Sequence, residues 1–363
     1  METNAAMKAK KLIIIWLIIV VTFLCVIGLS VAYVDPYFHY HKPLTDKYYY
    51  QLNHQRAMNN GIVKNFDYDA IITGTSLTEN FKTSELDELF GVNAVKVPFQ
   101  GGSLKELNDN LSVALRHNGN IKMIVRGIDF GQLMYDKDRM REDLGDYPTY
   151  LYDDNPFNDV EYWYNKEVLF SRVAAMALDR RDGVKPGIPT FDDYSEWGST
   201  KEYGAGVVLK DGYTVKDMPH QEGMSEEEKR TVHDNVTQNI TSLADRYKDV
   251  DFCYFIPPYS IVQWDVYMAE GSARKRIEAE KYAIELILEH DNIHFFSFNT
   301  CTDITTNLDN YYEMKHYGPK INSYILQSIR DNNHLLTKDN YGEYIDEELE
   351  FYLNYDYSSL SNV

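Results

Sequence analysis

The stretch Asp69–Asn80, with the sequence DAIITGTSLTEN, decides the fold that we expect for this chain. A short apolar run ends in Gly74-Thr75-Ser76, and apolar residues then recur at helical spacing as far as Phe90. This pattern predicts a strand, a sharp turn and an amphipathic helix, with Ser76 at the corner. Glycine permits the sharp turn, and the amides at the start of the helix would favour negative charge beside the serine.

Ser76 has two interpretations at this point. A serine in this position is placed as a nucleophile would be, at the exposed corner of a strand and a helix. Equally, Ser76 with Glu79 three residues later fits a capping box, in which the hydroxyl only satisfies an amide of the helix. The local sequence leaves both interpretations open.

Strands and helices alternate along most of the remaining chain. Alternation at this spacing predicts an α/β fold with a parallel, five-stranded sheet and right-handed crossovers. Ser103 with Glu106, and Ser225 with Glu228, are further capping-box patterns at expected helix starts. The expected strands are 69–73, 94–97, 121–127, 250–256 and 293–298, and the expected helices are 104–116, 160–178, 225–247, 272–289 and 320–329.

The N-terminus predicts a membrane anchor. Residues 12–34 carry no charge and follow Lys8, Lys10 and Lys11. As a helix they are long enough for the roughly 30 Å hydrocarbon core, and the basic flank (1–11) should stay in the cytoplasm. The globular part is then extracytoplasmic, on the cell membrane. A cleaved signal peptide, with Ser30-Val31-Ala32 as its cleavage site, is the alternative.

The composition of the chain after residue 34 predicts its division into segments and excludes some functions. We expect a connector at 35–67 that begins with an extended stretch (35–43) close to the bilayer surface. A domain at 68–331 follows, with a tyrosine-rich insertion at about 130–223 over its active face, and then an acidic C-terminal tail at 332–363 with one helix. The formal charge of −20 argues against nucleic acid as a partner. The histidines and cysteines lack metal-ligand spacing, so we expect neither a metal nor a cofactor.

Chemistry-bearing residues follow the strands of the expected sheet. Ligands bind outside the carboxyl ends of parallel strands. Ser76, Gly101-Gly102, Asp129, the segment 257–260 and the loop with Glu313 and His316 all fall there. A serine needs an imidazole to take its proton and a carboxylate to orient that imidazole, which Glu313-x-x-His316 could supply. Amides of Ser76 and of Gly101 or Gly102 could bind the oxyanion.

These motifs resemble the blocks of the SGNH (GDSL) hydrolase superfamily. The chain is similar to its membrane-anchored, extracytoplasmic members among bacterial cell-wall and surface-polysaccharide proteins, with a general likeness to the D-alanyl transfer protein of teichoic acid loci. The resemblance implies a three-layer, flavodoxin-like α/β/α sandwich. It also implies Ser76 as nucleophile, His316 as base, Glu313 as acid and Gly102 as an oxyanion donor.

Two residues depart from the family pattern. The third block usually supplies an asparagine, whereas this chain has Gly127-Ile128-Asp129, and an ionised Asp129 would repel an oxyanion. The asparagine donor of the family is then missing in this chain or is replaced by Asn80. Alternatively, Asp129 serves another role. Glu313 stands where an aspartate is usual, and Asp303 and Asp309 are alternative acids.

The resulting hypothesis is an extracytoplasmic serine esterase or O-acyltransferase that acts on cell-surface or cell-wall carbohydrate through an acyl-serine. The residues named are common to hydrolase and transferase. The sequence does not decide whether a partner membrane protein delivers the acyl group. The alternative is a non-catalytic scaffold, or a glycan-binding protein, in polysaccharide or teichoic acid assembly.

Overall fold

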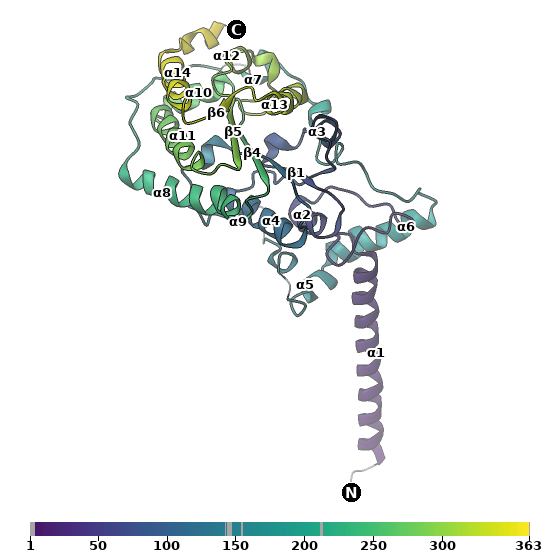
Figure 1. Ribbon diagram of the computed structural model, residues 1–363. Coiled ribbons are helices and arrows are strands. Elements are labelled where there is room, and N and C mark those ends of the chain that lie inside the picture. Colours follow the sequence, from purple (N-terminus) through teal and green to yellow (C-terminus); the bar gives the residue numbers. More distant parts are fainter. Residues whose placement is uncertain (1–3, 142, 144–146, 154, 211–212, 363) are drawn as a thin grey trace. The chain divides into compact units, whose positions relative to one another are not determined.

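The computed structural model describes residues 4–141, 143, 147–153, 155–210 and 213–362 (Figure 1). Parts of the expected basic tail, insertion and acidic tail thus lie outside the described residues. By its contacts the chain divides into two compact units, Met1–Phe66 with Pro148–Pro189, and Asp67–Tyr147 with Thr190–Val363. The residues expected as an insertion are shared between the units, and the expected domain limits remain a prediction.

The first unit is helical. Its longest helix, α1, is apolar and long enough to cross a membrane, and it begins earlier than the expected span because alanine and lysine extend it. The expected helix at 160–178 is interrupted, because the Asn165 side chain accepts the amides of Glu167 and Val168 and so starts a new helix. The elements are α1 (Asn4–Val34), α2 (Gln55–Asn65), η3 (Thr149–Leu151), α5 (Val160–Trp163), η4 (Glu167–Ala174) and α6 (Ala175–Arg181).

The connector contains α2, and its first residues (35–43), expected to be extended, instead fold back on Asp35. The fully buried Asp35 carboxylate accepts the amides of His39, Tyr40 and His41, at 2.7–3.0 Å, and the Tyr162 hydroxyl at 2.9 Å. Burial raises the pKa of Asp35 although these donors oppose the shift. A single carboxylate thus draws the chain into a compact turn.

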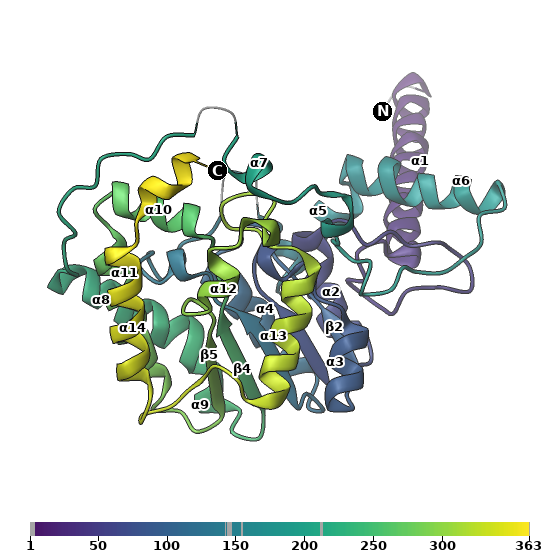
Figure 2. The ribbon, with the colours of Figure 1, turned by 90° about the horizontal axis from the view of Figure 1, so that it is seen from above.

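The second unit contains one mixed sheet with helices on both of its faces (Figure 2). Its strand order is β2-β1-β3-β4-β5-β6, with parallel pairing from β2 to β5. The expected count of five strands is wrong, because Leu335 and Leu336 pair antiparallel with β5 and add a sixth. The strands are β1 (Ala70–Thr73), β2 (Ala94–Lys96), β3 (Met123–Gly127), β4 (Asp251–Ile256), β5 (Ile293–Ser297) and β6 (Leu335–Leu336).

The helices of this unit pack in two groups: α3 contacts α13, while α11 contacts α8 and α14. Both capping boxes, at Ser103 with Glu106 and at Ser225 with Glu228, are confirmed. The elements are η1 (Ser76–Thr78), α3 (Thr83–Phe90), α4 (Leu104–His117), η2 (Phe130–Gln132), η5 (Gly198–Thr200), α7 (Ala205–Val208), α8 (Glu226–Val236), η6 (Thr237–Thr241), α9 (Ser242–Arg246), α10 (Ile261–Ala269), α11 (Ala273–Ile287), α12 (Thr302–Thr305), η7 (Leu308–Asn310), α13 (Pro319–Asp331), α14 (Tyr341–Asn354) and η8 (Tyr357–Asn362).

The C-terminal residues pack into the core of the second unit. Tyr352 of α14 is fully buried and stacks on Trp264, with ring centroids 3.8 Å apart, and its hydroxyl donates to the Asn299 carbonyl. The segment expected as an acidic tail is therefore anchored by a packed helix.

Candidate active site

Ser76 lies immediately beyond β1, at the turn that the sequence predicts. Gly74 has a φ of +153°, and a Cβ on it would collide with Cγ2 of Thr78. A Cβ on Gly127, at the end of β3, would also meet Thr78, at 2.7 Å. Both positions need glycine because the Thr78 side chain fills the space between the two strand ends.

The helix expected directly after Ser76 does not form there, and the capping box with Glu79 is wrong. Only the three-residue turn η1 follows, its N-cap is Thr75 without a side-chain bond, and α3 begins at Thr83. The buried Lys96 ammonium donates to the carbonyls of Glu79 and Phe81, and these bonds hold the segment between η1 and α3 in a non-helical path. A helix dipole therefore does not act behind the serine, whose hydroxyl has another partner.

That partner is His316. The Ser76 Oγ lies 2.7 Å from Nε2 of His316, and Nδ1 of the same ring is hydrogen bonded to Oε1 of Glu313. The same Glu313 oxygen accepts the backbone amides of Lys315, at 2.9 Å, and of His316, at 2.8 Å. Serine, histidine and carboxylate thus form one continuous hydrogen-bonded relay.

Glu313 is held in its ionised form. Burial opposes ionisation, but the hydrogen bond and charge of His316, with the two amides, outweigh it and lower the pKa of Glu313 to about 2. The side chains of His316 and Glu313 are 22% and 34% exposed, so the relay is half-buried and remains open to a substrate.

The loop that carries the relay is fixed at several points. Tyr311 and Tyr317 form a β-bridge across it, and the Ser260 hydroxyl donates to the Met314 carbonyl at 2.6 Å. The hydroxyl of Tyr317 and the side-chain amide of Asn322 both donate to the carbonyl of Leu77, the residue after Ser76, at 3.2 and 3.1 Å. These bonds tie the histidine loop directly to the serine turn.

Trp197 and Tyr312 lie beside the relay, and neither was predicted from the sequence. The Trp197 ring meets His316 edge-on, with centroids 5.5 Å apart, and lies 4.9 Å from the Tyr312 ring. Trp197 falls in a stretch without periodicity, so nothing in the pattern marked it. Tyr312 lies one residue before Glu313, and that closeness is the only signal that could have found it.

Asn80 holds Trp197 in place. Its side-chain oxygen accepts the amides of Trp197, at 3.1 Å, and Gly198, at 3.0 Å. The carboxamide predicted to bind an oxyanion or substrate thus has its oxygen committed to the loop that covers His316. This contact gives Asn80 a positioning role, while its Nδ2 has no hydrogen-bond partner among the described residues and remains available to donate to an oxyanion.

Gly101 and Gly102 lie near the site, but they differ in whether the backbone amide is free to bind an oxyanion. Gly102 donates its amide to the Phe99 carbonyl at 2.7 Å, so this predicted oxyanion donor is already engaged. Gly101 has a φ of +55°, and a Cβ there would collide with the Arg141 guanidinium. Its left-handed φ is what favours glycine, because the Arg141 side chain is flexible and could move aside.

Asp129 follows β3 and faces a cluster of phenols. Its Oδ1 accepts the Tyr259 hydroxyl and, at 3.2 Å, the Gly131 amide. Burial and the charge of Asp129 raise the pKa of Tyr259 and of Tyr317, so both phenols stay protonated and can donate. One Asp129 oxygen is thus already occupied by two donors from the protein.

A cavity of about 470 Å³ adjoins these residues. Lys315, next to His316 in the chain, contributes to its wall from the relay loop. Gln132 is 8% exposed, and its Oε1 has no hydrogen-bond partner among the described residues. The lining residues are Gly101, Gly102, Ser103, Asp129, Gly131, Gln132, Tyr135, Arg139, Met140, Arg141, Asp143 and Lys315.

The alternative acids lie elsewhere. Asp309 lies against Gly204, where an added Cβ would be 3.3 Å from its Oδ1, and Asp303 lines a separate cavity with Cys301. Among the described residues, no group of three or more histidine, cysteine, aspartate or glutamate side chains is arranged to hold a metal ion.

The chain has a distant likeness to solved structures. No model of a known family and no curated protein matches the chain. A solved structure from Streptococcus pneumonia, described as "a putative platelet activating factor", is similar with 14% identity and a TM-score of 0.40, over 77% of this chain and 91% of that chain. A likeness of this degree does not identify the function, which rests on the geometry of the site.

Proposed function

We propose that this chain is a serine acyl-transfer enzyme of the SGNH type. The observation that carries the proposal is the relay from Ser76 Oγ through His316 to the ionised Glu313. More particularly, we propose a membrane-anchored, extracytoplasmic esterase or O-acyltransferase that acts on surface carbohydrate.

The relay supports a two-step reaction. His316 Nε2 takes the Ser76 proton as Oγ attacks the acyl carbonyl, and then returns that proton to the departing alcohol. The acyl-serine is next attacked by water or by a sugar hydroxyl, whose proton passes to Nε2, and Ser76 regains a proton when the acyl group leaves. Glu313 holds the imidazole tautomer and stabilises the imidazolium in both steps.

The oxyanion site is the weakest part of the arrangement. With the Gly102 amide engaged, the donors left for it are the amides of Ser76 and Gly101 and the side-chain nitrogen of Asn80, which has no partner among the described residues, and Asp129 adds negative charge nearby. Rotation of the turn after Phe99 would release the Gly102 amide on substrate binding, since catalytic hydrogen bonds often form only in the complex.

The cavity supports a polar, hydroxyl-rich second substrate. Gln132 Oε1 and the second oxygen of the Asp129 carboxylate can accept further donors, which sugar hydroxyls supply. Arg139 and Lys315 bring positive charge to the same cavity and outnumber the carboxylate of Asp129, since Arg141 is paired with Asp143; the cavity can therefore accept a carbohydrate that carries an acidic group. The lysines before the apolar run of α1 support an extracytoplasmic site.

A second candidate is a non-catalytic scaffold with the same fold. The engaged Gly102 amide and the Asp129 carboxylate favour it, because both weaken an oxyanion site. Against it stands the 2.7 Å contact between Ser76 and His316, which a scaffold does not require.

The experiment is a pre-steady-state assay of the full chain with an activated acetyl ester. We expect a burst of alcohol close to one equivalent per chain, abolished in Ser76→Ala. Absence of a burst, together with unchanged slow hydrolysis in Ser76→Ala, would favour the scaffold.

A further inference from the structure

The outer part of α1 is covered by protein. Val31 and Val34 are 0% and 4% exposed, and the Tyr164 hydroxyl donates to the Leu24 carbonyl at 3.1 Å. A Cβ on Gly28 would lie 3.6 Å from the Trp163 ring. The first unit therefore packs on α1 from about Leu24 to the end of the helix, through α5 and η4.

The uncovered part of α1 is too short to span a bilayer. The apolar run begins after Lys11, and from Leu12 to Leu24 the helix rises roughly 20 Å, less than the roughly 30 Å of a hydrocarbon core. A full span has to continue to about Val31. Leu24 and Gly28, and the side chains that contact them, then lie at hydrocarbon depth.

The elements at this depth expose apolar side chains. Phe157 is 85% exposed, Phe170 67% and Val160 46%. They belong to α5, η4 and the segment before α5, and these two helices are the parts of the unit that pack on α1. Exposed apolar groups gathered beside a membrane-spanning helix are the sign of a lipid-facing surface.

We propose that the segment Phe157–Phe170 enters the outer leaflet of the membrane that α1 crosses. The protein is then held by a spanning helix and by an inserted collar, defined by Phe157, Val160 and Phe170. The proposal rests on α1 being the anchor of the proposed function, and it adds a second lipid contact.

Aromatic residues mark the upper edge of this collar. The Trp163 indole donates to the Tyr40 hydroxyl at 2.6 Å, and the Lys47 ammonium donates to the Tyr33 hydroxyl at 3.0 Å. Tryptophan, tyrosine and lysine are the residues that settle at the headgroup level. The Trp163 ring lies against Gly28 at hydrocarbon depth with its indole N–H bonded to Tyr40, and the Tyr33–Lys47 pair lies toward the end of α1. The exposed phenylalanines complete the apolar side.

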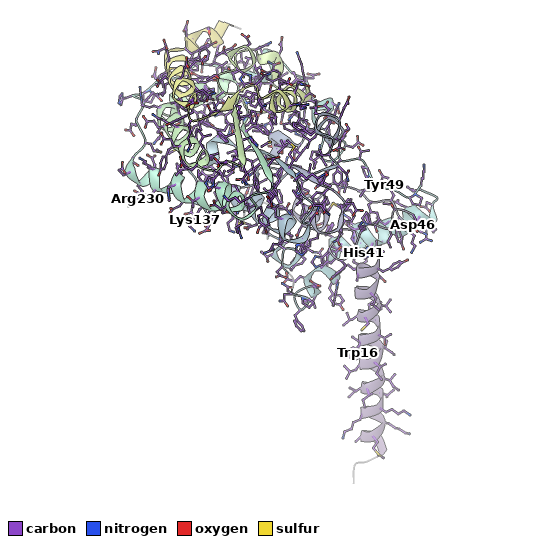
Figure 3. All side chains as sticks on the ribbon, in the orientation of Figure 1. Trp16, His41, Asp46, Tyr49, Lys137 and Arg230 are labelled. Carbon is purple, nitrogen blue, oxygen red and sulfur yellow. The ribbon has the colours of Figure 1, made fainter. Side chains whose placement is uncertain are left out.

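We infer that lipid covers the collar, because the collar adjoins the part of α1 that no other described part of the protein covers. Trp16, labelled in Figure 3, is 62% exposed and Leu12 is 66% exposed, as expected for a helix that a bilayer covers on all sides. A second copy of the chain is the other occupant that the experiment detects.

The experiment places an environment-sensitive fluorophore on the full chain in phosphatidylcholine nanodiscs. Single cysteines are introduced as Phe157→Cys, Phe170→Cys, Leu17→Cys and Met218→Cys, with the three native cysteines changed to alanine. Leu17 lies in the free part of α1, and Met218 is an exposed apolar residue of the second unit. We expect the labels at 157 and 170 to be quenched by nitroxide on lipid chains and shielded from iodide, as at 17, and the label at 218 to behave oppositely.

The outcomes separate the two levels of the proposal. If the label at 17 is in lipid while those at 157 and 170 match 218, the collar is refuted and the anchor stands. If none is in lipid, the anchor itself fails. Shielding from iodide without quenching by lipid nitroxide would point to a second copy and overturn the proposal.

A second measurement needs no substitution. The unchanged chain is placed in nanodiscs that contain a lipid with a photoreactive acyl chain, and the crosslinked peptides are identified by mass spectrometry. Crosslinks within 157–170 are expected, and crosslinks confined to α1 would refute the collar.

Discussion

Ser76 and His316 are 240 positions apart in the chain, yet their Oγ and Nε2 atoms lie 2.7 Å from each other. They meet because the turn after β1 and the loop before α13 share hydrogen bonds. The Leu77 carbonyl, which accepts from Tyr317 and Asn322, keeps them together.

Loss of either Ser76 or His316 should remove most of the activity. We expect Ser76→Ala and His316→Ala each to lower kcat for an activated acetyl ester by about 10³-fold or more, and the double variant to lose little beyond either one, since the pair acts as a unit. Ser359→Ala, whose hydroxyl bonds an exposed turn, is the control. Losses that multiply in the double variant would show two independent roles.

Glu313 should make stability depend on acid pH. Its pKa is lowered to about 2 from 4.5 in the folded state, so its contribution is complete above about pH 4.5 and is lost as the pH falls toward 2. The difference in melting temperature between the wild type and Glu313→Gln should therefore shrink over that range. Glu347→Gln, an exposed carboxylate, should show no such trend, and a constant difference for Glu313→Gln would contradict the prediction.

Removing the charge of Asp129 should speed hydrolysis of a small ester. Asparagine keeps an oxygen for Tyr259 and Gly131, and it removes a negative charge that opposes the oxyanion. We expect kcat/KM of Asp129→Asn to rise about two- to tenfold, as weakened repulsion across a partly solvated site allows. Asp303→Asn makes the same charge change in another cavity. A lower kcat/KM in Asp129→Asn alone would mean that the carboxylate orders the site.

The buried pair Glu280 and Glu348 should make the fold sensitive to alkali. Both side chains are 0% exposed, and burial raises the pKa of each. The folded state then holds more protons than the unfolded state above about pH 4.5, so stability falls as the pH rises through the raised pKa values. Glu348→Gln should gain stability relative to the wild type in thermal unfolding as the pH rises from about 5 through about 7, the raised pKa of Glu280.

The exposed neighbour Glu347→Gln is the control for this pair. An equal change in both variants, or a wild type whose melting temperature is flat over the same range, would contradict the assignment.

The sequence predicted the strands well and the connections less well. Apolar runs such as Ala70–Thr73 and Asp251–Ile256 form strands because they are buried on both faces. The prediction of a helix directly after Ser76 was wrong. The ammonium of Lys96, which is distant in sequence, donates to the carbonyls of Glu79 and Phe81 and holds this segment in a non-helical path. The strand β6 was missed because its two residues are too few to show periodicity.

The candidate site was likewise predicted only where its signal is local in the sequence. The pattern Glu313-x-x-His316 could be recognised as a candidate pair because both residues lie in one short loop and a carboxylate can orient a nearby imidazole. The engagement of the Gly102 amide and the placement of Trp197 on His316 depend on contacts, made by Phe99 and Asn80, that no local pattern encodes.

The central claim is an acyl group on Ser76, and mass spectrometry tests it most directly. The full chain is mixed with an activated acetyl ester, quenched in acid and digested. The account predicts an added acetyl group on the peptide that contains Ser76, absent in Ser76→Ala and greatly reduced in His316→Ala. An unmodified Ser76 peptide, or equal labelling in His316→Ala, would contradict it.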